Sequence, residues 1–144
     1  MESKLEEAKQ SMESLINVYK QLNLNGKQKA YYDWVFANGK VFVGINKLLP
    51  QGKMKFCYYN SQMYALENKQ AKYYEGWGIT EGIGIPLEHG FNVIEEQAYD
   101  KTWNNGLVYF GIHIPTKWVQ EYVVKTSMAD NLMYRYVMSI LEKT

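Results

Sequence analysis

From Lys72 onward the chain alternates apolar and polar residues with a period close to two, which is the repeat of a β-strand. The connections between these segments are short, and short connections join antiparallel neighbours. Four strands are predicted in this order: KYYEGWGIT, LEHGFNVI, QAYDKTW and LVYFGIHI. We therefore expect this part of the chain to form an antiparallel sheet of about four strands.

Helical periodicity lies on both sides of these strands. Residues 2–22 carry apolar side chains three and four positions apart, which predicts an amphipathic N-terminal helix. Another helix, KFCYYNSQMYALEN, would place Cys57 in its first turn. Thr116 and Ser127 are predicted to cap two C-terminal helices within residues 116–143. Helices before and after a block of strands are typical of an α+β domain.

The segment WVFANGKVFVG is compatible with two structures. Asn38-Gly39 can form a type I′ turn between β-prone flanks, which would add an N-terminal hairpin to the sheet. Alternatively, a helix ends at Gly39, since glycine is the usual residue after a helix C-terminus. The hairpin is the stronger signal, so we expect it.

Composition limits the classes of function that the chain can have. Its 144 residues suit a single domain, 1–144. The basic residues include one arginine, Arg135, and form no stripe, which argues against a nucleic-acid polymer as the partner. No apolar run approaches the roughly twenty residues of a membrane span. With no secretory core in MESKLEEAKQ and a single cysteine, a cytoplasmic location is expected.

Cys57 is the first candidate for a catalytic residue. A thiol is a good nucleophile only as the thiolate, and a helix N-terminus with Lys53 and Lys55 nearby favours the anion. His89 could take the thiol proton as a general base. The alternative is that Cys57 is a buried small apolar residue.

Asp100 is the candidate for orienting His89. If the two strands turn at residues 95–96, Asp100 lies diagonally across from His89 on the same face, with a Cα separation of roughly 7 to 8 Å. An odd-sized loop would shift the register by one residue and place them on opposite faces. His89 would then present its second ring nitrogen to Cys57, as in a catalytic triad. The alternative is an ordinary structural hydrogen bond.

Other kinds of site have less support. Cys57, His89 and His113 lack the paired short spacings of zinc ligands, so no metal site is predicted. The segment GWGITEGIG does not give G-x-G-x-x-G before a helix, and no cofactor is predicted. Glu75 is interpreted as a buried structural carboxylate or, less favoured, as a substrate contact.

Six segments in this order resemble a family of small bacterial and phage proteins: DWVFANGKVF, KFCYYN, YYEGWGI, EHGFNV, YDKTW and YFGIHIP. The order of cysteine, histidine and aspartate is also similar to the core of transglutaminase-like, papain-related thiol enzymes. The resemblance covers about residues 33–122 and leaves the first helix outside. It implies that Cys57 is the nucleophile, His89 the base and Asp100 the orienting group.

Two departures from the family pattern lie beside these residues. Gly90-Phe91 stands where the family usually has Ala-Trp, and Lys101 stands where it has Pro. The surroundings of His89 and Asp100 are therefore expected to differ from those of the family.

The sequence thus predicts a thiol-dependent acyl-bond hydrolase or acyltransferase of the transglutaminase-like type, acting on a small molecule or peptide. The alternative is a non-catalytic protein that binds a small ligand on the same scaffold, such as a phage anti-defence protein that sequesters a nucleotide-derived signalling molecule in the host cytoplasm. A third possibility is a homo-oligomer formed through residues 1–22. The residues predicted to contact the substrate or ligand are Tyr58, Asn60, Tyr74, Glu75, Trp77, Phe91, Asn92 and Trp103.

Overall fold

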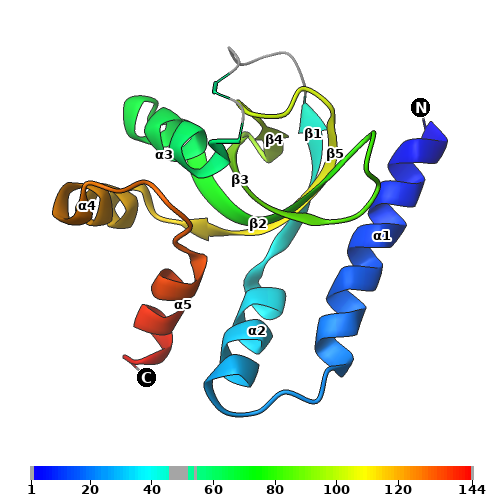
Figure 1. Ribbon diagram of the computed structural model, residues 1–144, viewed down its shortest axis with the longest axis horizontal. Helices are drawn as coiled ribbons and strands as arrows, with labels where there is room; N and C mark the ends of the chain where they lie inside the picture. Colours follow the sequence, from blue (N-terminus) through cyan, green and yellow to red (C-terminus); the bar gives the residue numbers. More distant parts are fainter. Residues whose placement is uncertain (1, 46–51, 54, 144) are drawn as a thin grey trace.

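The computed structural model describes residues 2–45, 52–53 and 55–143. These residues form an α+β fold of helices packed around one sheet, as predicted (Figure 1). The helices are α1 (Glu2–Gln21), α2 (Gly26–Asn38), α3 (Cys57–Glu67), α4 (Thr116–Thr126) and α5 (Met133–Leu141). The strands are β1 (Lys40–Ile45), β2 (Lys72–Thr80), β3 (Leu87–Ile94), β4 (Gln97–Tyr99) and β5 (Gly106–Ile114).

The sheet is mixed and closes into a barrel with the order β1-β4-β3-β2-β5. The antiparallel pairs are β2 with β3, β3 with β4, β2 with β5 and β1 with β5. β1 and β4 are parallel. The prediction of a purely antiparallel sheet of about four strands is therefore wrong. β1 pairs with both β4 and β5, which removes the two open edges that a four-strand sheet would leave.

The predicted hairpin at Asn38-Gly39 is also wrong, and the alternative with a helix is confirmed. α2 runs to Asn38, and the N–H of Gly39 donates to the carbonyl of Val35. The φ angle of Gly39 is −74°, whereas a type I′ turn needs a positive value. Val35 and Phe36 are buried by α2 in the core, and this packing decides the structure against the local β-preference.

The C-terminal helices form, but their ends differ from the prediction. Ser127, expected to cap the second helix, instead follows the end of α4 in a left-handed conformation with φ 59°. The N-terminus of α5 is capped by Glu75 of β2, whose Oε1 and Oε2 accept the N–H groups of Leu132 and Met133 at 2.7 and 2.8 Å. A carboxylate distant in the sequence thus replaces the local cap.

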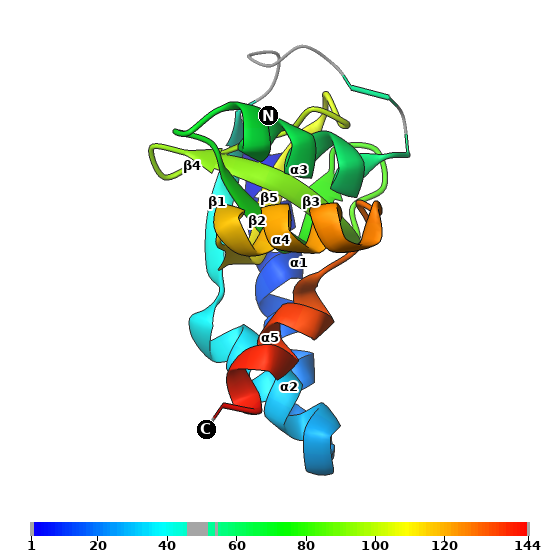
Figure 2. The ribbon, with the colours of Figure 1, turned by 90° about the vertical axis from the view of Figure 1, so that its left-hand side faces the viewer.

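The two faces of the sheet bury separate cores. Between the strands and the helices lies a large apolar cluster that includes Trp77 and Phe110. The other cluster consists of inward-facing side chains of the barrel: Phe42, Tyr74, Phe91, Val93, Ala98 and Tyr109. α3 packs across β3, as the view from the side shows (Figure 2). This contact brings the start of α3 to the barrel.

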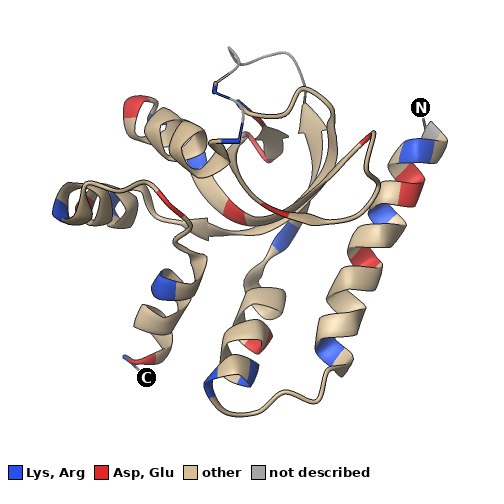
Figure 3. Cartoon of the chain, viewed as in Figure 1, with Lys and Arg blue, Asp and Glu red and all other residues tan. Residues whose placement is uncertain are grey.

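Both acidic and basic residues lie on α1 and on α2 (Figure 3). No helix among the described residues is both long and apolar enough to cross a membrane.

Candidate active site

Cys57 lies in the first turn of α3, as predicted, and is its first residue, because the helix begins two residues later than expected. The Cys57 side chain is partly exposed. The preceding residue, Phe56, makes no side-chain cap to the helix. α3 lies close to β3 at Gly90, where an added Cβ would be 2.9 Å from Oγ of Ser61 and 3.0 Å from the Tyr58 ring. The glycine at this position therefore allows the close approach of α3 beside His89.

The turn between β3 and β4 has the register that the sequence predicts. Glu95 and Glu96 both have positive φ angles, 50° and 67°, as a two-residue type I′ turn requires. Ile94 pairs with Gln97 directly across the turn. This even register places His89 and Asp100 on the same side of the sheet.

Asp100 is held by four hydrogen-bond donors. Its Oδ2 lies 2.7 Å from Nε2 of His89 and also accepts the hydroxyl of Tyr109 at 2.7 Å. Its Oδ1 accepts the backbone N–H groups of Thr102 and Trp103 at 2.8 and 3.0 Å. All acceptor positions of the carboxylate are therefore in use, and its orientation is fixed.

The imidazole of His89 lies flat against the indole of Trp103. The ring centroids are 3.5 Å apart and the planes are inclined by 8°. Gly78 on β2 leaves room for the indole, because an added Cβ would be 2.6 Å from Cζ3 of Trp103. The stack and the hydrogen bond to Asp100 together fix the plane of the imidazole.

His89 has two neighbours that act on its pKa, the Asp100 carboxylate at 2.7 Å from Nε2 and the Cys57 side chain. Since Nε2 is engaged by Asp100, Nδ1 is the nitrogen left for the thiol. Burial lowers the pKa of His89, but the hydrogen bond and negative charge of Asp100, together with the Cys57 side chain, raise it by more, so the pKa ends above its usual value. Burial alone would raise the pKa of Asp100, but the hydrogen bond from His89 and its other donors bring it below the usual value.

Asn60 joins the two segments that carry the site. Its Nδ2 donates to the carbonyl of Lys53 at 2.8 Å and to Oγ1 of Thr102 at 2.9 Å. The first bond reaches the segment before Cys57, and the second reaches the segment after Asp100. Asn60 thus fixes the thiol and the carboxylate relative to each other.

The other residues predicted to contact a ligand are dispersed by the fold. Tyr58 of α3 lies beside Gly90 of β3, and Asn92 donates to the carbonyl of Ser61. Tyr74 and Phe91 pack inside the barrel. Their substrate contacts stay predictions.

Glu75 and Trp77 project from β2 toward the helices, on the face opposite to Tyr74. Glu75 caps α5 and accepts the hydroxyl of Tyr73 at 2.6 Å. Trp77 stacks on Phe36 with ring centroids 5.4 Å apart. The structural interpretation of Glu75 agrees with these contacts.

Tyr109 is the site residue that the sequence analysis missed. The alternation of β5 places Tyr109 on the same face as Gly111 and His113, which is the signal that could have directed attention to it. The sequence does not predict that Tyr109 binds Asp100, because the segment from Asp100 to Trp103 is no longer paired as part of β4.

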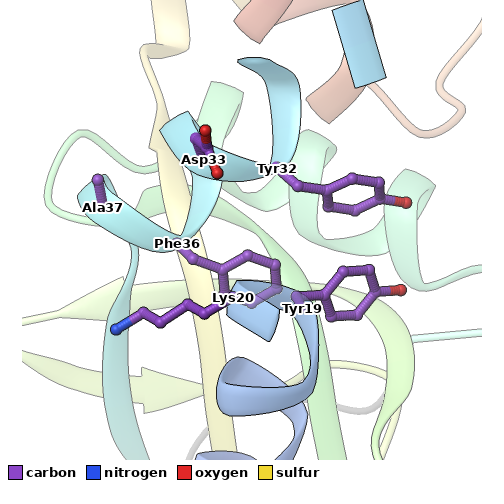
Figure 4. Close-up of a pocket in the computed structure, with 6 residues that line it drawn as sticks. All are labelled: Tyr19, Lys20, Tyr32, Asp33, Phe36 and Ala37. Atoms are coloured by element: carbon purple, nitrogen blue, oxygen red, sulfur yellow. The ribbon is translucent and has the colours of Figure 1, made fainter. Parts of the chain in front are cut away.

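A hollow of about 320 Å³ lies away from this site, between α1 and α2 (Figure 4). Its aromatic residues face one another: the rings of Tyr19 and Tyr32 stack at 4.6 Å, and those of Tyr19 and Phe36 at 4.9 Å. The stacked faces of these rings are therefore in contact with protein.

Among the described residues, no three His, Cys, Asp or Glu side chains are grouped so that they could hold a metal ion. Comparisons with protein-family models, curated proteins and solved structures find no match to this chain. What the site can do must therefore be inferred from its own geometry.

Proposed function

We propose that the protein is a thiol-dependent acyl-bond hydrolase or acyltransferase in which Cys57, His89 and Asp100 act as a triad. The observation that carries this proposal is a buried imidazole whose Nε2 lies 2.7 Å from the Asp100 carboxylate. Cys57, at the start of α3, is near enough to act on the pKa of the same imidazole. Triads are recognised by geometry and roles, and this order of groups is the one they need. The order of cysteine, histidine and aspartate along the chain, which is similar to that of transglutaminase-like enzymes, supports the same proposal.

In the first half of the reaction, Nδ1 of His89 takes the proton of the Cys57 thiol. The thiolate attacks the carbonyl carbon of an amide or ester and forms a C–S bond. As the C–N or C–O bond breaks, His89 returns the proton to the leaving amine or alcohol. Asp100 stays ionised and stabilises the imidazolium that forms between these two transfers.

In the second half, water or an amine enters as the acceptor. His89 removes its proton while it attacks the thioester carbon, and the C–S bond breaks to give a carboxylic acid or a new amide. The proton then returns to the sulfur, so the protein ends in its starting state.

The start of α3 supplies donors for the oxyanion. The first N–H groups of a helix have no partner within the helix, and the N–H of Cys57 is one of them. Donors of this kind stabilise the negative oxygen of a tetrahedral intermediate. Phe56, the residue before Cys57, makes no side-chain hydrogen bond to this end of the helix.

Acylation by p-nitrophenyl acetate tests the proposal. An acetyl thioester should form on Cys57 and be located by mass spectrometry, and it should be absent in Cys57→Ser. His89→Gln should acylate at least about 100-fold more slowly. His113→Gln is the matched control, since this second histidine lies on β5 against Tyr74, and it should keep the wild-type rate. Acetylation confined to lysines, or equal rates in both histidine variants, would contradict the proposal.

The binding-protein alternative has less support. Tyr74 and Phe91 belong to the packed interior of the barrel, Trp77 belongs to the helix-facing core, and Trp103 covers His89. These rings therefore stack on protein groups rather than on an open surface.

A further inference from the structure

Tyr109 binds the carboxylate oxygen of Asp100 that makes no bond to the backbone. Oδ2 of Asp100 receives two donors, Nε2 of His89 and the hydroxyl of Tyr109, each at 2.7 Å. Both lone-pair directions of this oxygen are therefore filled. The negative charge of Oδ2 is therefore shared between the Tyr109 phenol and the His89 imidazole.

Glycines on the two strands beside β5 leave space for the Tyr109 ring inside the barrel. An added Cβ at Gly44 of β1 would lie 2.9 Å from the Tyr109 ring, and one at Gly78 of β2 would lie 3.1 Å from it. The ring also packs against Phe91, with centroids 4.8 Å apart. β1 and β2 thus each have a glycine where a side chain would clash with the Tyr109 ring, and Tyr109 is completely buried.

We propose that Tyr109 is a positioning residue of the Cys57–His89–Asp100 site, which holds Oδ2 of Asp100 in place and shares its negative charge with His89. This inference rests on the proposed function. A phenylalanine would fill the same space in the barrel, but it would leave His89 as the single donor to that oxygen. The hydroxyl is therefore the part of Tyr109 that acts on the site.

Few other groups near His89 could change its protonation equilibrium. Facing it are Cys57 from α3 and Asp100 from the segment after β4, both of which raise its pKa, together with Tyr109 from β5. From β2 the residue paired with His89 is Gly76, which carries no charge, and Trp103, stacked on the imidazole, is not titratable. Next to it on β3, Glu88 is exposed and points to the other face.

The experiment follows the titration of His89 by NMR in protein labelled with ¹⁵N-histidine. The chain has two histidines, so His113→Gln assigns the signals. In Tyr109→Phe the full charge of Oδ2 acts on the imidazolium, and the midpoint of His89 should move upward by about one pH unit. Incorporation of 3-fluorotyrosine at position 109 makes the phenol a stronger donor, and the midpoint should then move downward.

Tyr73→Phe is the matched control. Tyr73 is another fully buried tyrosine that donates to a buried carboxylate, Glu75, at 2.6 Å. Both variants lose the hydrogen bond from a buried phenol to a buried carboxylate, and Tyr73→Phe also loses the bond that Tyr73 accepts from Gln62 at 3.0 Å. Only Tyr109→Phe should move the midpoint of His89. If the Phe variant does not fold, the fluorotyrosine protein decides the question by itself.

An unchanged His89 midpoint in both Tyr109 proteins overturns the inference, and so does an equal shift in Tyr73→Phe. The fate of the proposed function is read separately, from the acylation of Cys57 in the wild-type protein. No acylation of the wild type together with a shifted His89 midpoint would contradict the proposed enzymatic function and support the role of Tyr109. Acylation of the wild type together with an unshifted midpoint would support the proposed function and contradict the role of Tyr109.

Discussion

Nε2 of His89 lies 2.7 Å from Oδ2 of Asp100, and both side chains are almost completely shielded from solvent. The assembly of this pair depends on the two-residue turn at Glu95 and Glu96, because any shift of one residue would separate the two side chains. The central claim is that this pair controls the proton of the Cys57 thiol.

Replacement of Asp100 by asparagine should leave the fold intact and stop the chemistry. The amide Oδ1 can still accept the N–H groups of Thr102 and Trp103, but an NH₂ group replaces Oδ2 and donates toward His89. Nε2 would then have to accept, which leaves a proton on Nδ1, the nitrogen that must receive the thiol proton. The acylation rate of Cys57 should fall about 100-fold or more.

The control for this variant is Asp33→Asn, which alters an exposed aspartate paired with Lys29. It should acylate at the wild-type rate. A wild-type rate in Asp100→Asn would show that Asp100 has only a structural role.

Removal of the Asn60 side chain should loosen the site without dismantling the barrel. Asn60→Ala loses the bonds to Lys53 and Thr102, and two lost buried hydrogen bonds cost roughly 1–3 kcal/mol of unfolding free energy. Because the segment before Cys57 is then untethered, the acylation rate should also fall. Urea unfolding and acylation of Asn60→Ala are compared with those of Asn38→Ala, whose side chain bonds only within its own exposed helix end. Equal behaviour of the two variants would contradict the tethering role.

A methyl group at Gly78 should displace the indole from the imidazole. In Gly78→Ala the new Cβ would lie 2.6 Å from the Trp103 ring, and overpacking of this kind costs about 1–3 kcal/mol. His89 would lose its stacked neighbour, so its ring-current NMR shift should decrease. Gly82→Ala serves as the control, since nothing lies within 4 Å of a Cβ there and its unfolding free energy should change by less than about 0.5 kcal/mol. An unchanged His89 shift in Gly78→Ala would contradict this account of the stack.

Glu75 should make the protein less stable as pH rises. Burial raises its pKa to about 7, although Tyr73, Leu132 and Met133 donate to it and work in the opposite direction. The folded state therefore holds this proton more tightly than the unfolded state, and the contribution present below pH 4.5 is lost as pH rises to about 7. At most this loss amounts to about 1.4 kcal/mol per pH unit.

Glu75→Gln tests this relation, because it removes the titrating group. Between pH 5 and 6 the unfolding free energy of the wild type should fall more steeply than that of the variant. This window lies below the usual pKa of histidine, so His89 is protonated in both the folded and the unfolded state and does not obscure the comparison. Identical slopes would show that Glu75 remains charged in the fold.

Much of the sheet could be predicted because its signals are local. β2 and β3 have the predicted bounds, and the turn between β3 and β4 follows from the alternation on either side of it. β4 ends three residues into the predicted segment because Asp100 uses its carboxylate to bind the N–H groups that a longer ladder would need. The pairing of His89 and Asp100 could be predicted for the same reason, because it follows from the register of this turn.

The features that the sequence did not reveal depend on contacts between distant segments. β1 closes the barrel by a parallel pairing with β4, which no periodicity in either segment signals. Glu75 replaces a local cap on α5, so a search for capping residues near Met133 finds the wrong one. Tyr109 reaches Asp100 only after the barrel has closed.

The most direct test of the central claim is the rate of alkylation of Cys57 by iodoacetamide as a function of pH. In the wild type and in His113→Gln, the rate should stay near its maximum at pH 6.5 to 7 because His89 holds the thiol proton. In His89→Gln, the rate should rise only near the pKa of a free cysteine, about 8.5. A wild-type profile that rises only near 8.5 and coincides with that of His89→Gln would contradict the account.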